Sequence, residues 1–458
     1  MKLYDTLTGT KKEFIPLRDV VTMYVCGPNL YGPCHVGHAL SYVFFDILRR
    51  YLEYSGHRVI QVQNFTDIED RIIEVAQAEG RGIEDLASQY IQRFLEEMDG
   101  LGIQRATHYP KATDYLERMI DIISDLIQKG HAYVVEGDVY FRVRTFKDYG
   151  SLSRRSVDDV KSGTRIEEDP RKEDQMDFAL WKASKEGEPS WPTPWGSGRP
   201  GWHIECTAMS LSLLGNQIDI HGGGQDVIFP HHENEIAQSE VFTGMSPFVQ
   251  FWVHNGLLRL SDNDEEKMTR HRGNIVSCRE ALSEYTADTL RLYFASSHYR
   301  SPLTYSEEGL RSARRALGRL LNTLRLLPDN QGNGQQIDVQ THQERFFAAM
   351  EDDLNTPQAL AAIFDLTRDI NRHKEQGGLV ASGQQSLREM AAILGLSLNE
   401  DHDSDVKDAY PFVDILVDTR NRLRSERNWD LADQIRSQLE ALGVAIEDTA
   451  NGTQWRFI

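Results

Sequence analysis

The chain has 458 residues and a formal net charge of −20, and these two properties set the first limits on its function. Its length exceeds one ordinary hydrophobic core, so we expect two to four domains in a globular protein. The acidic excess argues against general attraction to nucleic acid, so any contact with RNA must use local clusters of Lys and Arg.

The first elements of the chain alternate between strand and helix. A short apolar strand over residues 22–26 ends at Gly27-Pro28, and apolar residues then recur at helical spacing up to about Ser55, where Gly56 terminates the helix. A second strand follows over residues 59–62. This order predicts an α/β fold with a Rossmann-like, doubly wound parallel sheet, whose ligands bind at the carboxyl ends of the strands.

The middle of the chain predicts an insertion and then the second half of the sheet. Helical periodicity covers residues 84–129, a strand pair follows over 132–144, and a strand over 217–221 leads into Gly222-Gly223-Gly224 and a helix near His231. Beyond about Leu310, long helical patterns with one basic face predict an α-helical bundle. The arginine-rich end of the chain, which includes Arg420, predicts a small C-terminal domain.

The sequence lacks the features of a membrane or secreted protein. No apolar run approaches the roughly 20 residues that a membrane helix needs, and charged residues follow Met1 too closely for a signal peptide. We therefore expect a cytoplasmic protein. Four cysteines are too few for a disulfide framework, and in a reducing compartment they are more often metal ligands, nucleophiles or buried residues.

His35 and His38 form the first candidate site. They lie three positions apart, after a strand and at the start of a helix, where both rings reach one face beside N–H groups without helical partners. Imidazole donors at a helix N-terminus would stabilise the charge that develops on the α-phosphate of ATP when a carboxylate attacks it. Two histidines at this spacing are also common at surfaces and metal sites, but the place between strand and helix favours the anion site.

Cys26, Cys206, His231 and Glu235 form the second candidate site. His231 and Glu235 share one helix face, and the two cysteines end segments that flank the predicted cleft. Two thiolates, an imidazole and a carboxylate suit Zn²⁺, and the wide cysteine spacing disfavours a compact zinc module. His232 is a rival ligand, or else a solvated helix residue.

Two further motifs are weaker. The glycine run before Asp226 offers bare backbone for an adenine or ribose, with Asp226 placed to accept a hydroxyl, although an ordinary tight turn also explains it. Lys267 and Arg270 lie three positions apart in a charged segment and suit the β- and γ-phosphates of ATP, although a solvated surface loop is the simpler interpretation.

Together these motifs resemble those of the cysteinyl-tRNA synthetases, a family of class I aminoacyl-tRNA synthetases. Cys26-Gly27-Pro28 with His35-Val36-Gly37-His38 is similar to the family's HIGH signature. Further similar blocks occur in family order over residues 201–206, 221–226 and 229–235, and later at Asp352-Asp353-Leu354-Asn355-Thr356-Pro357 and Trp455-Arg456. The resemblance covers nearly the whole chain.

The resemblance implies a reaction and a set of residues. The reaction is ATP-dependent activation of L-cysteine, with Mg²⁺, to cysteinyl-adenylate and transfer to the 3′ end of tRNA(Cys). One Zn²⁺ per subunit binds the substrate thiolate and is held by Cys26, Cys206, His231 and Glu235. His35, His38, Lys267 and Arg270 are the implied catalytic residues, Thr66 and Trp202 contact cysteine, and Gly224, Asp226, His35, His38 and Arg270 contact ATP.

The resemblance also gives functions to the parts of the chain. Residues 1–120 and 196–255 are the two halves of the catalytic domain, residues 121–195 a connective insertion, and residues 256–310 a stem-contact region with a KMSKS-like loop. Residues 311–400 are a tRNA-binding helical bundle and residues 401–458 a small anticodon-binding domain. We expect a monomer without membrane contact.

Two alternatives stay open, and the second of them rests on a departure from the family's motif. Lys267-Met268-Thr269-Arg270-His271 differs from KMSKS at its last three positions, and Arg270 changes the reach and hydrogen-bond geometry of a lysine. The alternatives are a ligase that joins cysteine to a small amine, and a catalytically impaired paralogue that binds zinc and tRNA. The basic bundle argues against a small acceptor. Cys34 and Cys278 have no assigned role, although Cys34 adjoins His35 and is a candidate for oxidative inhibition.

Overall fold

A four-stranded parallel sheet organises the N-terminal part of the molecule. The computed structural model describes residues 1–155, 169–259, 276–325, 337–399, 410–449 and 452–457. The strands lie in the order β11 (Val249–Asn255), β10 (Ile218–Gly224), β3 (Val20–Val25) and β4 (Arg58–Gln63), and all neighbours are parallel. They are nearly continuous buried runs, as in sheets covered on both faces. The predicted Rossmann-like sheet is confirmed.

The connections place the reversal of strand order between β3 and β10. Helix α1 (Val36–Tyr54) leads from β3 to β4 on one side, and α7 (Glu233–Thr243) leads from β10 to β11 on the other. The sequence predicts α1 well, because His35 caps its first turn and Gly56, at a φ of 90°, ends it. A crevice at the carboxyl ends of β3 and β10 is therefore the expected ligand site.

Each face of the sheet packs against a different part of the chain. Alternate strand residues such as Met23 and Tyr24 belong to two separate hydrophobic clusters, because successive side chains point to opposite faces. The Met23 face packs against α1, α3 (Ile83–Gly100) and the helical bundle. The Tyr24 face packs against α4 (Leu116–Gln128), α6 (Trp202–Leu214) and the insertion.

The insertion between β4 and β10 adds a second sheet. After α2 (Asp70–Glu79), α3 and α4, five antiparallel strands pair in the order β5-β6-β7-β9-β8. Their bounds are Ala132–Val135, Asp138–Phe141, Phe178–Ala183, Gly196–Pro200 and Trp191–Thr193.

The prediction of continuous helix over residues 84–129 is wrong between α3 and α4. There the chain runs beside β4, where the Gln63 amide donates to His108 O (3.0 Å) and the Phe65 amide to Pro110 O (2.8 Å). The segment supplies hydrogen-bond partners for the edge strand of the parallel sheet.

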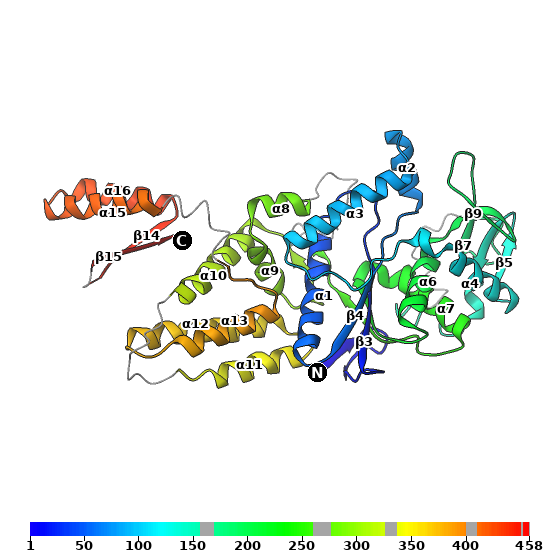
Figure 1. Ribbon diagram of the computed structural model, residues 1–458, viewed down its shortest axis with the longest axis horizontal. Helices are drawn as coiled ribbons and strands as arrows, with labels where there is room; N and C mark the ends of the chain where they lie inside the picture. The colour runs from blue at the N-terminus through cyan, green and yellow to red at the C-terminus, as the bar shows by residue number, and fades with distance from the viewer. Residues whose placement is uncertain (156–168, 260–275, 326–336, 400–409, 450–451, 458) are drawn as a thin grey trace.

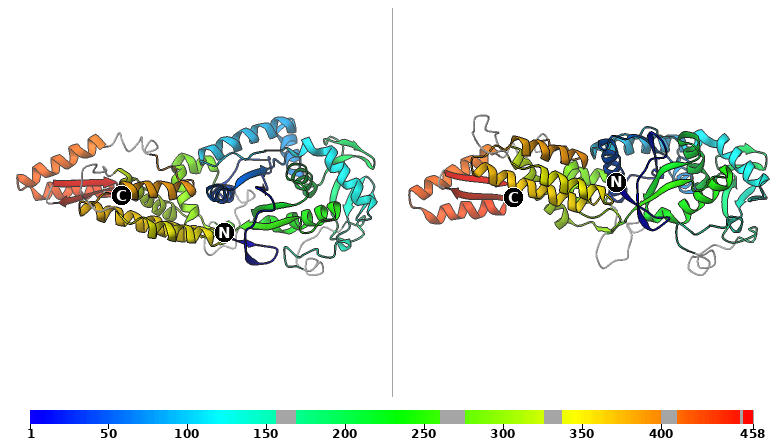
Figure 2. Two further views of the ribbon diagram at one scale, coloured as in Figure 1. Left: turned by 60° about the horizontal axis from the view of Figure 1, so that its bottom comes forward. Right: turned by 90° about the horizontal axis from the view of Figure 1, so that it is seen from below.

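Helices form the C-terminal half, and the molecule is elongated (Figures 1 and 2). Short strands β12 (Leu258–Arg259) and β13 (Leu303–Thr304) pair beside α8 (Cys278–Glu284) and α9 (Ala287–Ala295). The bundle follows, with α10 (Glu307–Arg325), α11 (Gln340–Glu351), α12 (Thr356–Glu375) and α13 (Ala381–Ile393). The last unit contains α15 (Tyr410–Ser425), α16 (Trp429–Ala441) and the hairpin of β14 (Val444–Thr449) and β15 (Gly452–Phe457).

Two buried polar residues join the bundle to the N-terminal part of the molecule. Asp353, between α11 and α12, accepts hydrogen bonds from the Tyr4 amide (2.8 Å), the Tyr299 hydroxyl (2.7 Å) and the Arg300 guanidinium (2.9 Å). Arg291 of α9 pairs with Asp46 of α1 and donates to the backbone at the ends of α3 and α13. The Asp352-Asp353 motif therefore anchors the bundle to the N-terminal strand β1 (Lys2–Asp5), which pairs with β2 (Thr10–Glu13).

The C-terminal unit has its own small core. Val413, Val417, Leu439, Val444 and Ile446 form a hydrophobic cluster separate from the other two. Arg420 is 2% exposed and pairs with Asp448 at 2.8 Å, so it supports this unit rather than contributing to a solvent-facing basic surface. No helix within the described residues is long and apolar enough to span a membrane.

Candidate functional site

A cavity of about 390 Å³ opens at the carboxyl ends of β3 and β10, where the strand order reverses. Its walls come from the segment after β3, the first turn of α1, the end of β10 and the segment after β11. Among its lining residues are predicted site residues from every sequence block that the structure describes: Cys26, His35, His38, Thr66, Trp202, Cys206, Gly224, Asp226 and His231.

The histidine pair lies at the N-terminus of α1, as its sequence position predicts. His35 Nδ1 accepts from the Gly37 amide (3.1 Å), and His38 Nδ1 accepts from the His35 amide (3.3 Å). The two rings stack with centroids 3.8 Å apart. This reciprocal capping fixes both rings at the positive end of the α1 dipole, beside the cavity.

Two glycines allow the backbone to approach closely at the cavity. A Cβ on Gly27 would lie 1.6 Å from the carbonyl oxygen of Asn64, so only glycine fits where the segment after β3 crosses the end of β4. A Cβ on Gly224 would lie 2.4 Å from Asp226 Oδ1. The glycine run itself forms the last three residues of β10 rather than a tight turn.

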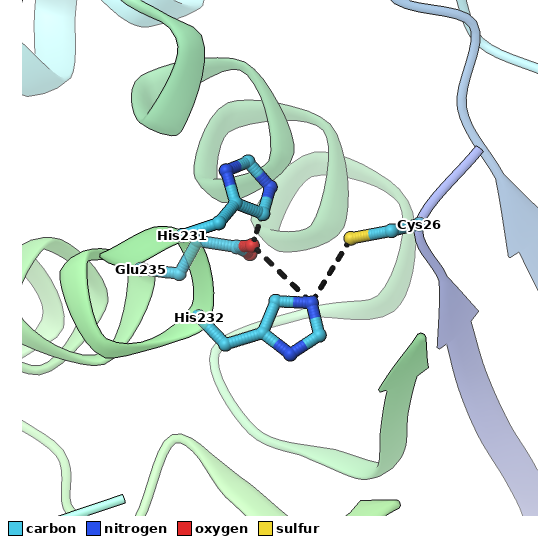
Figure 3. Close-up of side chains that lie close together, drawn as sticks. All are labelled: Cys26, His231, His232 and Glu235. Carbon is cyan, nitrogen blue, oxygen red and sulfur yellow. Dashed lines mark hydrogen bonds and ion pairs between the residues drawn. The ribbon is translucent and has the colours of Figure 1, made fainter. Parts of the chain in front are cut away.

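Four potential metal ligands converge at the base of the cavity. One ligand atom from each of Cys26, His231, His232 and Glu235 lies within 4.8 Å of the others, as Figure 3 illustrates. Cys26 Sγ is 3.1 Å from His232 Nε2, and Glu235 Oε1 is 3.0 Å from His231 Nε2. Cys26 follows β3, whereas His231 and His232 lie in the turn before α7 and Glu235 lies in the first turn of α7, so two distant segments meet here.

The buried thiol of Cys206 lies beside the same cluster. It interacts with the Cys26 thiol and with the His231 ring from the first turns of α6. Cys26, His231 and Glu235 thus belong to both the predicted ligand set and the observed cluster, which adds His232. Cys206 adjoins this group through its interactions with Cys26 and His231.

The His232 ring is held by a buried series of hydrogen bonds through His254 to Thr6. Its Nδ1 lies 2.8 Å from His254 Nε2, and His254 Nδ1 lies 2.8 Å from the Thr6 hydroxyl. Burial, followed by the charges of His221 and His254, keeps the pKa of His232 well below its usual range. Burial likewise lowers the pKa of His254 to about 3. Both rings are therefore neutral, and His232 can donate from Nε2 to a Cys26 thiolate.

The pKa values of His231 and Glu235 are raised, in contrast to the lowered pKa values of His232 and His254. Burial alone lowers the pKa of His231, but the charges of Glu235 and Cys206 raise it overall to about 10. Burial raises the pKa of the Cys26 thiol and of Glu235. Both Glu235 carboxylate oxygens are buried without a well-formed hydrogen bond. Such a concentration of anionic ligands needs a proton or a cation at its centre.

Thr66 and Trp202 complete the wall next to this cluster. The Thr66 hydroxyl donates to Glu205 Oε2 (3.2 Å), and its carbonyl accepts from the Leu30 amide (3.2 Å). The Trp202 ring stacks on His231 with centroids 4.2 Å apart. Both side chains therefore lie at the boundary between the ligand cluster and the open cavity.

A second cavity of about 410 Å³ shares Trp202 as a wall and extends toward the insertion. Phe178 and Phe229 supply further aromatic surface, and Lys172 lies at its edge. Among the described residues, Lys172 makes a cation–π contact with Tyr140 and no ion pair.

One predicted pair stays untested, and two buried histidines of the site were not predicted. Lys267 and Arg270 lie outside the described residues. His221 and His254 were missed, although both occupy buried strands and His254 shares its strand face with Trp252, a period-two signal.

The three parts of the chain match three protein families. Residues 14–315 match the class I (C) tRNA synthetase catalytic domain, residues 345–399 the DALR domain, and residues 411–456 the cysteinyl-tRNA ligase anticodon binding domain.

Curated relatives are similar over the full length. A cysteine–tRNA ligase of Dehalococcoides mccartyi is 52% identical over 457 residues, covering 100% of this chain and 99% of the relative. Another, of Carboxydothermus hydrogenoformans, is 45% identical, covering 100% of both chains. Among solved structures, the Mycobacterium tuberculosis methionyl-tRNA synthetase bound by methionyl-adenylate superposes with a TM-score of 0.59 at 16% identity, covering 83% of this chain and 88% of that one. This last likeness concerns the fold.

Proposed function

Because this chain belongs to the cysteine–tRNA ligase family of class I aminoacyl-tRNA synthetases, we propose that it activates L-cysteine with ATP and transfers the cysteinyl group to tRNA(Cys). The observation that carries the proposal is the cluster of thiol, imidazole and carboxylate groups beside the capped histidine pair. The first group suits a metal that selects a thiol, and the second suits the phosphates of ATP.

The donor set fits Zn²⁺. Sulfur, nitrogen and oxygen ligands converge from two segments, and the buried Glu235 oxygens, which have no well-formed hydrogen bond, suit a metal cation. Bound there, Zn²⁺ would act as a Lewis acid that binds the thiolate of the substrate cysteine. The side chains of serine, alanine and valine offer no thiolate, so these amino acids would bind less well. The cavity walls at Thr66 and Trp202 would orient the amino acid over this centre.

We propose Cys26, Cys206, His231 and Glu235 as the four protein ligands. His232 has a different task, because its Nδ1 is engaged by His254 and its Nε2 lies 3.1 Å from Cys26 Sγ. A neutral ring in this position donates to the Cys26 thiolate and orients it. Cys206, held against both Cys26 and His231, is the better fourth ligand.

The chain's contribution to the first chemical step is positioning and charge stabilisation. His35 and His38 would stabilise the anionic α-phosphate as the cysteine carboxylate attacks, with help from the dipole of α1. Gly224 and Asp226 would hold the adenosine at the end of β10. Lys267 and Arg270 would bind the outer phosphates with Mg²⁺, an assignment that rests on the sequence motif.

The second cavity would receive the single-stranded 3′ end of the tRNA. It begins at Trp202, where the activated carboxyl group would lie, and it continues away from the ATP side of the site. Phe178 and Phe229 offer stacking surfaces for bases, and Lys172 offers a cation for a phosphate.

We also propose the remaining assignments that the sequence suggests. The division into residues 1–120, 121–195, 196–255, 256–310, 311–400 and 401–458 is kept, with the last two parts binding tRNA. The matched DALR and anticodon binding domains support those two. A cytoplasmic monomer is expected, and a sedimentation experiment at micromolar concentration tests the monomer.

Cysteine-dependent ATP–pyrophosphate exchange by zinc-loaded protein tests the proposed function. We expect exchange with cysteine and little with serine, and loss of exchange after zinc removal. Transcribed tRNA(Cys) should then be cysteinylated. Adenylate formation without tRNA charging would favour the small-amine ligase, and no exchange at all would favour an impaired paralogue.

A further inference from the structure

The two cysteines outside the proposed metal site face one another. Cys34 precedes His35, and Cys278 is the first residue of α8. Their segments form an antiparallel bridge in which His35 opposes Ser277. The Val36 amide donates to Val276 O, and the Cys278 amide donates to Cys34 O, both at 3.0 Å. Cys34 and Cys278 are therefore directly opposed, one position further along the same bridge.

This register brings the backbones of Cys34 and Cys278 to a separation that a disulfide can span. Opposed residues of an antiparallel hydrogen-bonded pair have Cα atoms about 5.5 Å apart. A disulfide forms across Cα separations of roughly 4.4–6.8 Å. Cys34 and Cys278 are 5% and 1% exposed and belong to the same hydrophobic cluster. After burial, the charge of Cys34 is the largest influence that raises the pKa of Cys278, so the two thiols lie in one buried electrostatic environment.

We propose that Cys34 and Cys278 form a reversible disulfide that slows adenylate formation under oxidising conditions. The part of this inference that concerns activity rests on the proposed function, whereas formation of the disulfide does not. The oxidant is a low-molecular-weight disulfide, and cystine, the oxidised form of the proposed substrate, belongs to this class.

The exchange reaction proceeds in two balanced steps. One protein thiolate attacks cystine, so that a mixed disulfide forms, the cystine S–S bond breaks and one cysteine leaves. The second protein thiolate attacks the mixed disulfide, the Cys34–Cys278 bond forms and a second cysteine leaves. Two protein thiols are oxidised, one cystine is reduced, and the two thiol protons end on the released cysteines. Because both thiols are buried, the bridge must open briefly for the first attack.

The bond would act on the ATP side of the site through His35. Cys34 adjoins His35, which caps α1 and lines the cavity. Closing an S–S bond of about 2.05 Å between these residues moves the segment before α1 relative to the first turn of α8. A displacement of about 1 Å at a catalytic group can cost on the order of 10²-fold in rate. Oxidation should therefore slow adenylate formation while the cysteine pocket around Cys26 keeps its ligands.

The test uses the zinc-loaded full chain incubated with cystine and then digested without reduction. We expect mass spectrometry to find one peptide pair joined through Cys34 and Cys278, with the loss of two hydrogens. ATP–pyrophosphate exchange should fall at least about tenfold and recover with dithiothreitol. Cys278→Ala should exchange as well as the unsubstituted protein before oxidation and resist cystine, and Cys34→Ala provides a second resistant variant if Cys278→Ala folds poorly.

Three results would overturn the proposal. They are a digest without the Cys34–Cys278 pair, an oxidised protein with full exchange activity, and an equal loss of activity in Cys278→Ala. The last result would identify the metal-site cysteines as the oxidised groups. If the pair forms in a protein that never shows exchange, the proposed function fails and the disulfide stands.

Discussion

The choice between Cys206 and His232 as the fourth metal ligand gives the sharpest test of the site. Replacing a direct ligand and replacing the donor behind it have different consequences. We expect Cys206→Ser to lose zinc, because it removes a thiolate that interacts with both Cys26 and His231. His232→Gln should keep zinc, because an amide N–H can still reach toward Cys26 Sγ, which lies 3.1 Å from the imidazole Nε2.

The expected losses of zinc affinity follow from dividing the free energy of zinc binding among the four ligands. A structural zinc site is worth about 10–16 kcal/mol, so one of four ligands contributes about 2.5–4 kcal/mol. Since 1.4 kcal/mol is a factor of ten, Cys206→Ser should weaken zinc binding by about 10²–10³-fold. His232→Gln should stay within about tenfold, and His232→Ala, which removes the donor altogether, should cost about 10–100-fold.

Competition with a chromophoric chelator measures these affinities, and Co²⁺ substitution reports the number of thiolates. The thiolate-to-cobalt absorption of Cys206→Ser should fall to about half that of the unsubstituted protein, because one of two sulfur ligands is lost. His232→Gln should keep the full intensity. If His232→Gln instead loses zinc and Cys206→Ser retains it, the ligands are Cys26, His231, His232 and Glu235, and the proposed assignment is wrong.

Three other predictions concern the second cavity and the two polar joints. Lys172→Gln should lower kcat/KM for tRNA charging by about tenfold without changing pyrophosphate exchange. As a control, Lys185→Gln at an exposed position should leave both activities unchanged. An equal loss of charging and of exchange in Lys172→Gln would refute the RNA role. Asp353→Ala should destabilise the chain by about 3–5 kcal/mol in urea unfolding, because it leaves Arg300 without its buried partner; a change below 1 kcal/mol would contradict this. Hydrogen bonds from Arg420 hold the pKa of Asp448 below its usual range. The stability that this pair gives the C-terminal unit is therefore present above about pH 4 and is lost as the pH falls further. Thermal unfolding of this unit should show the loss, and Asp448→Asn should abolish the pH dependence.

Local patterns predicted the elements whose signals are contained in their own residues. The βαβ unit was predictable because β3 and β4 are buried on both faces and α1 has a cap at His35 and a stop at Gly56. The extended segment after α3 was not, because its conformation depends on the edge of β4, to which it hydrogen-bonds. A helical period persists in its sequence although the partner strand determines the structure.

The candidate site was likewise predictable only where its residues are close together in the sequence. The spacing of His231 and Glu235 places them on one helix face, but no local signal brings Cys26 beside His232, because β3 and α7 are far apart in the chain. The support of His232 by His254 also depends on the packing of α7 against β11. The burial of Arg420 could not be predicted either, because it depends on a salt bridge with Asp448 and the arginine-rich composition alone suggests an exposed side chain.

The separate core of the C-terminal unit has a consequence for how stability is measured. Its five core residues share no cluster with the sheet or the bundle, so this unit can lose its structure while the rest of the chain remains folded. Unfolding should then occur in at least two transitions, and a single free energy of unfolding would not describe the chain. Mild heating should therefore abolish tRNA charging before it abolishes cysteine activation, which would separate the two half-reactions by temperature alone.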